Sequence, residues 1–283
     1  MKLAFFGYDF FADCLHAAEA NGHEVVAVFS NPCDNKRYDF NIRVRDFAKR
    51  RKLPFSMREP TDKDIRRLTK RGCELLVVAA YAYRVPLPDG APPGINIHPS
   101  LLPIGRGRWP MPWTILKKHE YTGVSIHRLR AELDAGEIIW QERFRVAERE
   151  TLESLSARVQ MLAREGASAV FRDVSLLHRG GHPQGEGETW PMPPDDVRTL
   201  DWTASVDDID RVARAFGKFG SYAIFNEKEW LVQDATTWRE SHSYAPGTVV
   251  HRASCEVVIA AADGYVCLRY FEIDPDFARK AKT

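Results

Sequence analysis

Residues 1–100 alternate short apolar runs with longer segments of helical periodicity, and this alternation constrains the fold more than any other feature. Buried strands are predicted at 2–6 and 23–30, on either side of a helix near 10–21. Helical patterns near 42–51 and 62–71 precede two further strands at 74–81 and 94–100. Because such βαβ units place helices over parallel strands, we expect a Rossmann-like α/β domain whose mostly parallel sheet has helices on both faces.

Between 99 and 151 the pattern changes within the same predicted domain. The stretch 99–112 holds four Pro and two Gly, so we expect a loop there, followed by a helix over 113–118. Strands are predicted at 122–129 and 137–146, and a long helix over 151–178 closes the domain.

The clearest change of composition is the Gly- and Pro-rich stretch 179–196, which indicates a linker. Beyond it a short helix is predicted near 206–215, followed by alternating runs from 221 onward with turns at Pro246-Gly247 and Asp263-Gly264. We therefore expect a larger catalytic domain at 1–180, a linker at 181–200, and a smaller, mostly-β, OB-like domain at 201–283.

Charge and cysteine usage exclude several classes of protein. The chain has 40 Lys and Arg against 39 Asp and Glu, so no overall positive field would draw it to nucleic acid or to an anionic membrane. The five cysteines are odd in number and form no CxxC pair, which favours reduced thiols, and hence a cytoplasmic protein, over a disulfide framework or a zinc site. Asp9 and Asp13 interrupt the N-terminal apolar run before a signal or membrane-spanning segment is complete.

Polar side chains of complementary chemistry gather at the predicted strand ends. Asn96 and His98 lie at the carboxyl end of the strand 94–100, where open α/β sheets hold their ligands, and their spacing of two directs both side chains to one face. Asp134 precedes the strand 137–146. An amide that stabilises an oxyanion, an imidazole that moves a proton and a carboxylate that raises the imidazole pKa are the groups that acyl transfer to an amine requires.

Taken singly, these residues have plainer interpretations, because a lone His at a strand end is most often structural and Asp near Gly usually marks a turn. Their combination with Ser100 to Pro103 and Arg106-Gly107 is more specific. Together they match the signature of the folate-dependent formyltransferase family, which is Asn-x-His, Ser-Leu-Leu-Pro, Arg-Gly and Asp-x-Gly. The chain resembles this family over nearly its whole length, in the layout of the methionyl-tRNA formyltransferases and most closely the amino-sugar N-formyltransferases.

The resemblance implies a role for each of these residues. Asn96 would stabilise the transition state, His98 would accept and donate the proton, and Asp134 would tune His98. The implied co-substrate is 10-formyltetrahydrofolate, with no metal. The implied folate contacts are Val85, Pro86, Leu87, Arg108, Arg130, Ala131, Glu132, Leu133 and Asp134, and the implied acceptor contacts are Ser100, Arg106, Gly107, Trp109 and Gly136.

Other motifs add little. Gly7 lacks the further glycines of a dinucleotide fingerprint, and no Walker A, His-Glu-x-x-His or Gly-x-Ser-x-Gly pattern occurs. His127 is expected to be an ordinary strand residue. The basic stretch 36–52 carries a local charge of +6 and could hold a phosphate or a tRNA, although the solvated face of a helix is the plainer interpretation. Trp109, Trp113 and Tyr121 either wall an acceptor pocket or pack a loop.

The identity of the amine stays open among several classes. The segment 30–41 is short and only mildly basic for gripping tRNA, and the residues after the Ser-Leu-Leu-Pro loop depart from the Arg-Gly-Ala-Ala-Pro of the tRNA enzymes. The amino group of a nucleotide-linked sugar is therefore favoured. The alternatives are methionyl-tRNA, an amino-acid or hydroxyornithine-type natural-product precursor, and an inactive folate-binding regulatory protein. We expect no membrane contact, and apolar strands of the C-terminal part are a candidate homodimer contact.

Overall fold

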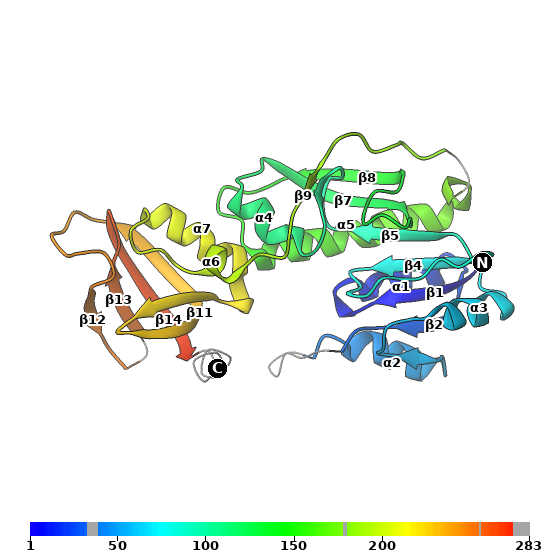
Figure 1. Cartoon of the computed structure of the whole chain (residues 1–283), viewed down its shortest axis with the longest axis horizontal. Coiled ribbons are helices and arrows are strands. Elements are labelled where there is room, and N and C mark those ends of the chain that lie inside the picture. The colour runs from blue at the N-terminus through cyan, green and yellow to red at the C-terminus, as the bar shows by residue number, and fades with distance from the viewer. Residues whose placement is uncertain (33–38, 178–179, 255, 274–283) are drawn as a thin grey trace. The chain divides into compact units, whose positions relative to one another are not determined.

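The computed structural model describes residues 1–32, 39–177, 180–254 and 256–273, with the side chains of the last strand described as far as Arg269. These residues form two compact units, which are considered separately (Figure 1). The first unit comprises 1–107, 121–145 and 157–189, and the second comprises 108–120, 146–156 and the chain from 190 onward. Cys33, Cys255 and residues 36–38 of the basic stretch lie outside the described residues.

The first unit is built on a seven-stranded sheet with the order β3-β2-β1-β4-β5-β7-β8. Neighbouring strands from β3 to β5 run parallel, whereas β7 is antiparallel to both β5 and β8. Every residue of β4 is buried, as expected for a central strand covered on both faces. The predicted mostly parallel sheet is thus confirmed. Its strands are β1 (Lys2–Gly7), β2 (Glu24–Phe29), β3 (Phe55–Ser56), β4 (Leu75–Ala79), β5 (Gly94–His98), β7 (Tyr121–Arg128) and β8 (Ile138–Arg145).

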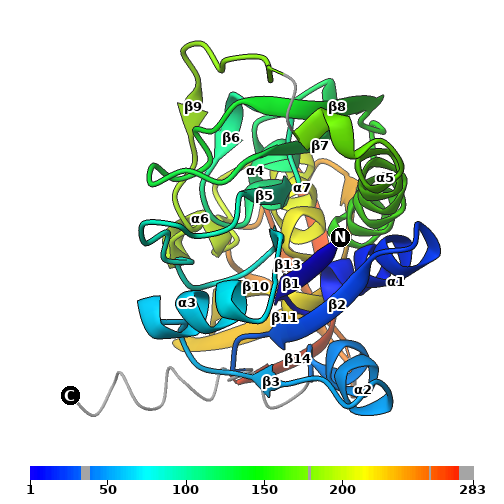
Figure 2. The ribbon, with the colours of Figure 1, turned by 90° about the vertical axis from the view of Figure 1, so that its right-hand side faces the viewer.

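Helices cover both faces of this sheet, as predicted (Figure 2). α1 (Ala12–Ala20), α2 (Ile42–Arg50) and α5 (Leu152–Arg172) lie on one face, and α3 (Asp62–Lys70) lies on the other. Each helix turns an apolar stripe to the sheet; in α3 these residues are Ile65 and Leu68, while the rest of the helix is largely charged.

Two local predictions need correction. The stretch 99–112 is not entirely loop, because β6 (Ile104–Arg106) pairs in parallel with β9 (Glu188–Thr189). The following helix, α4, spans Pro110–Leu116 rather than 113–118, since proline is well tolerated in the first turn of a helix. The long helix α5 ends at Arg172, and a 3-10 helix over Val174–Leu177 follows; residue 178 lies outside the described residues.

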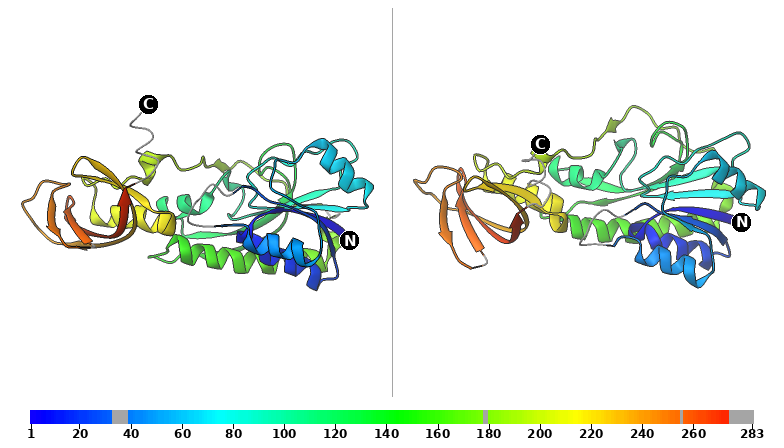
Figure 3. Two further views of the ribbon diagram at one scale, coloured as in Figure 1. Left: turned by 90° about the horizontal axis from the view of Figure 1, so that it is seen from below. Right: turned by 60° about the horizontal axis from the view of Figure 1, so that its bottom comes forward.

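The second unit contains an antiparallel sheet, which confirms the predicted smaller, mostly-β part of the fold (Figure 3). Its antiparallel sheet has the order β10-β11-β14-β13-β12, and α7 (Val206–Phe216) packs its buried Val206 and Ile209 into the core of the sheet. Among the described residues, no helix combines the length and the apolar composition that a bilayer crossing requires. The other elements are α6 (Asp195–Arg198), β10 (Ser221–Phe225), β11 (Lys228–Arg239), β12 (Val249–Arg252), β13 (Glu256–Ala260) and β14 (Gly264–Ile273).

Candidate active site

The end of β5 and its antiparallel neighbour β7 supply the first part of a polar cluster. Asn96 pairs across the ladder with His127, and His98 pairs with Ser125. Directly opposed residues on antiparallel strands point to the same face, so these side chains share one side of the sheet. His98 and His127 are both buried, with ring centroids 6.4 Å apart.

Asp134 reaches this cluster from the turn between β7 and β8. Its backbone has a φ of +51°, in the left-handed region that non-glycine residues rarely adopt. Gly136 follows, and a Cβ at that position would lie 1.8 Å from the carbonyl oxygen of Arg128, so only glycine allows this close approach. The Asp-x-Gly pattern thus reflects a turn folded tightly back over β7.

The carboxylate of Asp134 is the centre of the cluster. Asn96 Nδ2 donates to its Oδ1 at 2.9 Å, and the backbone amide of Gly107 donates to its Oδ2 at 2.8 Å. Nδ1 of His98 lies 3.7 Å from Oδ2, and Nε2 of His127 lies 3.5 Å from Oδ1. The structure therefore brings the three predicted residues Asn96, His98 and Asp134 together around one buried charge.

The hydrogen bonds of His98 determine which nitrogen is the base. Its Nε2 lies 2.8 Å from the carbonyl oxygen of Gly105, which can only accept, so Nε2 carries the hydrogen in the neutral ring. Nδ1 then presents its lone pair on the side of Asp134. Burial lowers the pKa of His98 below its ordinary value, although the nearby carboxylate opposes this shift. His98 is consequently a neutral base at neutral pH, with a carboxylate poised to stabilise its protonated form.

The same reasoning fixes the tautomer of His127 and the orientation of Asn96. Nδ1 of His127 lies 2.9 Å from the carbonyl oxygen of Arg128, so the hydrogen is on Nδ1 and Nε2 is an acceptor. Asn96 Nδ2 lies 3.1 Å from that Nε2, in addition to its bond to Asp134. Both amide hydrogens of Asn96 are therefore engaged, one by a carboxylate and one by a neutral imidazole.

Asp134 stays ionised in this setting. Burial alone would raise the pKa of its carboxyl, but the attraction between the carboxylate and positive charge on the His98 and His127 rings, together with the hydrogen bond from the Gly107 amide, outweighs burial and lowers the pKa to about 2. The cluster therefore holds one permanent negative charge beside a neutral base.

The residues expected to contact folate lie on two loops that touch each other. The guanidinium of Arg84 donates to the carbonyl oxygen of Ala131, which joins the loop after β4 to the loop after β7. Val85 is buried in the core, whereas Leu87 and Leu133 are 40% and 66% exposed. Pro86 is half-buried, Ala131 and Glu132 are exposed, Arg130 pairs with Glu137 at 2.8 Å, and Arg108 is exposed in the second unit.

The residues expected to contact the acceptor divide into two groups. Gly107 and Gly136 shape the Asp134 turn, while the Ser100 hydroxyl is buried and donates to the carbonyl oxygen of Ile104 at 2.8 Å, so it holds the loop together. Arg106 donates through Nε to Gln184 at 3.0 Å. Trp109 lies in the second unit, with ring centroids 5.8 and 5.5 Å from those of Phe216 and Phe219, so it packs against α7 and the turn that follows.

Two contacts of the cluster were not anticipated from the sequence. His127 is a strand residue, as expected, but it also bonds Asn96. Gln184, in the segment predicted as a linker, donates through Nε2 to the carbonyl oxygens of Asp134 and Gly136, each at 2.7 Å. His127 could have been found only from the pairing of its strand, Gly-x-Ser-x-His, with the Asn-x-His strand. No sequence pattern pointed to Gln184.

Around α2, part of the basic stretch is neutralised. The guanidinium groups of Arg43, Arg45 and Arg51 pair with Asp13, Asp39 and Glu19 respectively. Lys49, Arg50 and Lys52 are exposed and have no ion pair among the described residues, so the described part of this stretch is a solvated helix face whose charge is neutralised only in part.

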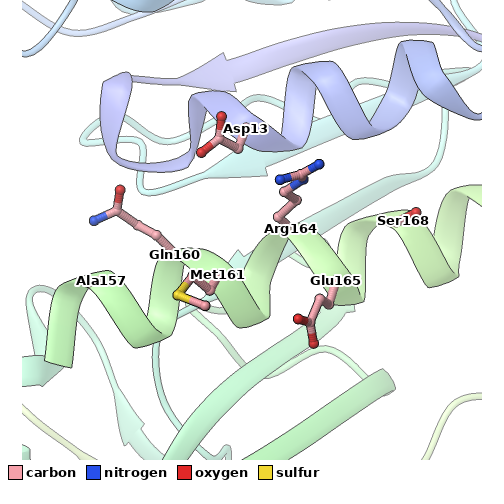
Figure 4. Close-up of a pocket in the computed structure, with 7 residues that line it drawn as sticks. All are labelled: Asp13, Ala157, Gln160, Met161, Arg164, Glu165 and Ser168. Atoms are coloured by element: carbon pink, nitrogen blue, oxygen red, sulfur yellow. The ribbon is translucent and has the colours of Figure 1, made fainter. Parts of the chain in front are cut away.

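A shallow hollow of about 570 Å³ lies between α1 and α5 (Figure 4). Its wall combines Asp13 from α1 with Gln160, Arg164 and Glu165 from α5, and Asp13 is already paired with Arg43. None of its lining residues belongs to the cluster around Asp134.

Comparisons with known proteins agree with one another. A family model described as "Formyl transferase" matches residues 1–171, and one described as "Formyl transferase, C-terminal domain" matches 194–275. The chain is 28% identical to a methionyl-tRNA formyltransferase of Agathobacter rectalis, over 95% of this chain and 90% of that protein.

Solved structures show the same fold. HypX from Aquifex aeolicus, in a multiply substituted variant, aligns with a TM-score of 0.71 at 19% identity, over 96% of this chain but only 44% of HypX. An N-formyltransferase from Helicobacter canadensis, crystallised with folinic acid and dTDP-3-aminofucose, aligns with a TM-score of 0.69 at 16% identity, over 96% of this chain and 100% of that one.

Proposed function

Because this chain belongs to the formyl transferase family, we propose that it moves a formyl group from 10-formyltetrahydrofolate to a primary amine at the cluster of Asn96, His98 and Asp134. The convergence of the Asn96 amide and the neutral His98 imidazole on the ionised carboxylate of Asp134, at 2.9 and 3.7 Å, is the observation that carries this proposal. The predicted family resemblance is confirmed by the matches to both family models.

In the proposed reaction the amine nitrogen attacks the formyl carbon. A carbon–nitrogen bond forms, the carbonyl oxygen becomes an oxyanion, and Nδ1 of His98 takes the proton that the amine loses. The imidazolium then faces Asp134 Oδ2 at 3.7 Å, so the proton converts a lone negative charge into a buried ion pair. When the carbon–nitrogen bond to the folate breaks, His98 returns the proton to the departing folate nitrogen.

Asn96 has to release one hydrogen bond to stabilise the oxyanion. Its bond to the Asp134 carboxylate is charge-assisted, whereas its bond to His127 joins two neutral groups and is the weaker of the two. We therefore expect the hydrogen that faces His127 to turn to the oxyanion. A preorganised donor of this kind contributes about 3–4 kcal/mol to lowering a barrier.

The folate would lie where the loops after β4 and β7 meet. The Arg84 bond to Ala131 holds these loops side by side, and the exposed apolar side chains Leu87 and Leu133 stand on them. Apolar surface of this kind suits a flat aromatic ring, and polar backbone groups of the loop 130–134 suit its edge. The Helicobacter canadensis protein of the same fold was crystallised with folinic acid, which supports a folate here.

For the acceptor, we propose the amino group of a nucleotide-linked sugar. Residues 191–273 carry eight Lys and Arg against 13 Asp and Glu, so the described C-terminal part is acidic. On α2 the guanidinium groups of Arg43 and Arg45 are already paired with Asp13 and Asp39. A tRNA is bound chiefly through its phosphates by unpaired Lys and Arg, and the acidic C-terminal part is poorly suited to such contacts. The Helicobacter canadensis structure contains a nucleotide-linked amino sugar, which agrees with this choice.

Methionyl-tRNA is the second candidate acceptor, because the relative from Agathobacter rectalis bears that name and matches this chain nearly end to end. A small nucleic-acid footprint at the acceptor stem would need fewer basic groups than a full tRNA surface.

The experiment is a parallel assay of the purified chain with 10-formyltetrahydrofolate and three acceptors: a nucleotide-linked amino sugar, methionyl-tRNA and a hydroxyornithine-type amine. Release of tetrahydrofolate and formation of the N-formyl product are measured together. We expect product with the amino sugar. Product with methionyl-tRNA alone, falling steeply with salt, would replace the sugar by tRNA, and no product with any amine would contradict formyl transfer.

A pair of histidine variants provides the matched control. His98→Gln removes the proposed base, whereas His251→Gln removes an exposed histidine on β12, whose side chain is 58% exposed. We expect His98→Gln to lose at least about 100-fold in kcat, as positioned acid–base groups contribute about 100- to 10,000-fold, and His251→Gln to keep full activity.

A further inference from the structure

Building on the proposed formyl transfer, we infer that Gln184 is a positioning residue that holds the Asp134 turn in its catalytic conformation. Its side-chain amide donates both hydrogens to the turn, one to the carbonyl oxygen of Asp134 and one to that of Gly136, each at 2.7 Å. Its Oε1 accepts from Nε of Arg106 at 3.0 Å. Gln184 therefore joins the loop that carries the carboxylate to the loop that carries Gly107.

The turn has a physical need for such a clamp. Asp134 sits in the left-handed region at a φ of +51°, which costs a non-glycine residue about 1 kcal/mol or more, so the conformation persists only where its surroundings enforce it. Among the described residues, no backbone amide donates to the carbonyl oxygen of Asp134 or of Gly136. Gln184 supplies the donors that these carbonyls would otherwise lack.

The segment around Gln184 is built to lie close to both loops. His182 exchanges two backbone hydrogen bonds with Ile138, at 2.8 and 2.9 Å, and β9 pairs with β6. Gly181 and Gly187 stand on either side: a Cβ on Gly181 would lie 2.8 Å from Cβ of Glu137, and a Cβ on Gly187 would lie 2.2 Å from the carbonyl oxygen of Pro103. Only glycine permits this approach at Gly187, because the opposing atom is backbone.

Gln184 touches no reacting atom, so it acts through Asp134. The amide of Gly107, on the second clamped loop, donates to Oδ2 of Asp134 at 2.8 Å, and the same carboxylate faces His98. A turn freed from Gln184 would let the carboxylate drift relative to His98. Misplacement of a catalytic group by about 1 Å costs about 100-fold in rate.

The test compares Gln184→Met and Gln184→Glu with the same changes at Gln160, a half-buried residue of α5 outside the cluster. Methionine keeps the length of the side chain without its donors, and ionised glutamate turns two attractive contacts with carbonyl oxygens into repulsive ones. We expect kcat to fall by about 10- to 100-fold in both Gln184 variants, with KM for either substrate within about threefold. Hydrogen exchange of 129–137 should be faster in both variants, and the Gln160 variants should match wild type.

The outcomes separate the two proposals. Wild-type protein that transfers no formyl group refutes the proposed function, and the hydrogen exchange of 129–137 then still reports whether Gln184 holds the turn. Active wild type together with unchanged kcat in the Gln184 variants overturns the positioning role. A rise in KM without a fall in kcat, or unchanged exchange of 129–137, also overturns it. If Gln184→Glu fails to fold, Gln184→Met decides the result.

Discussion

Replacing Asp134 by asparagine removes the central charge of the cluster with almost no change in volume. The carboxylate is buried, its Oδ2 lies 3.7 Å from Nδ1 of His98, and its pKa of about 2 keeps it charged at neutral pH. When His98 takes a proton, the two groups form an ion pair that attracts by about 4 kcal/mol at that distance, for an effective dielectric constant of about 20.

This attraction sets the expected loss of rate. If the proton transfer is largely complete in the transition state, losing about 4 kcal/mol corresponds to about 1,000-fold in kcat. Asparagine also has only one oxygen that can accept, whereas both oxygens of Asp134 accept a hydrogen bond. The new NH2 group would therefore face the donor of either Asn96 or Gly107, and that hydrogen bond would be lost. The residual dipole of the new side chain restores part of the attraction. We expect a loss between about 100- and 1,000-fold.

The assay is steady-state release of tetrahydrofolate at saturating amine, with thermal unfolding measured on the same samples. Glu137→Gln is the matched control, because it makes the same change of charge three positions later in an ion pair with Arg130 at the surface. We expect kcat of that variant within about threefold of wild type, since exposed ion pairs contribute little. A kcat for Asp134→Asn within threefold of wild type would show that the charge does not stabilise the protonated His98.

Four further predictions concern pH and stability. Burial lowers the pKa of His98, so the neutral base persists throughout the neutral range, and kcat/KM should fall only below about pH 6.5, as a pH–rate profile would reveal. Because the unfolded chain takes up that proton first, the free energy of unfolding should also decrease as pH falls through the same range; an increase in urea titrations would contradict the buried neutral state. Gly123→Ala should destabilise by about 1–3 kcal/mol, because its Cβ would lie 2.0 Å from the carbonyl oxygen of Glu142, and an unchanged thermal midpoint would refute this. Ser205→Ala removes the oxygen that accepts from the amide of Asp208 at 3.2 Å at the start of α7, and should cost about 1 kcal/mol by chemical denaturation, with no change in kcat.

The sequence predicted those parts of the site that depend on local geometry. A period of two is intrinsic to any extended strand, so Asn96 and His98 had to share a face once the strand was recognised. The carboxyl end of β5 then had to be a ligand edge, because the preceding strands run parallel. Asp134 followed from the family signature, and its turn from the nearby glycine.

The remaining contacts depend on distances along the chain that no local pattern encodes. His127 faces Asn96 because of the register between β5 and β7, and a shift of one residue would have turned it to the other face. Gln184 lies 50 positions after Asp134, in a stretch whose Gly and Pro content is typical of a linker. Composition could not show that two of those glycines permit close approach to the loops. The start of α4 was also predicted three residues too late, at 113 instead of Pro110, because a proline occurs in the first turn of a helix as readily as in a loop.

The arrangement of charge explains why this cluster can be buried at all. An unpaired carboxylate in a dry site is costly, but here the Asn96 side chain and the Gly107 backbone amide both donate to Asp134, so the resting state already compensates part of its charge. Proton transfer to His98 then creates a neutral pair from an anion and a neutral ring. The oxyanion that forms on the formyl group carries one negative charge, so the net charge of the site is conserved, and the Asn96 donor faces that charge only after the amine has attacked. A site of this design gains most from excluding water after the amine has bound in its neutral form.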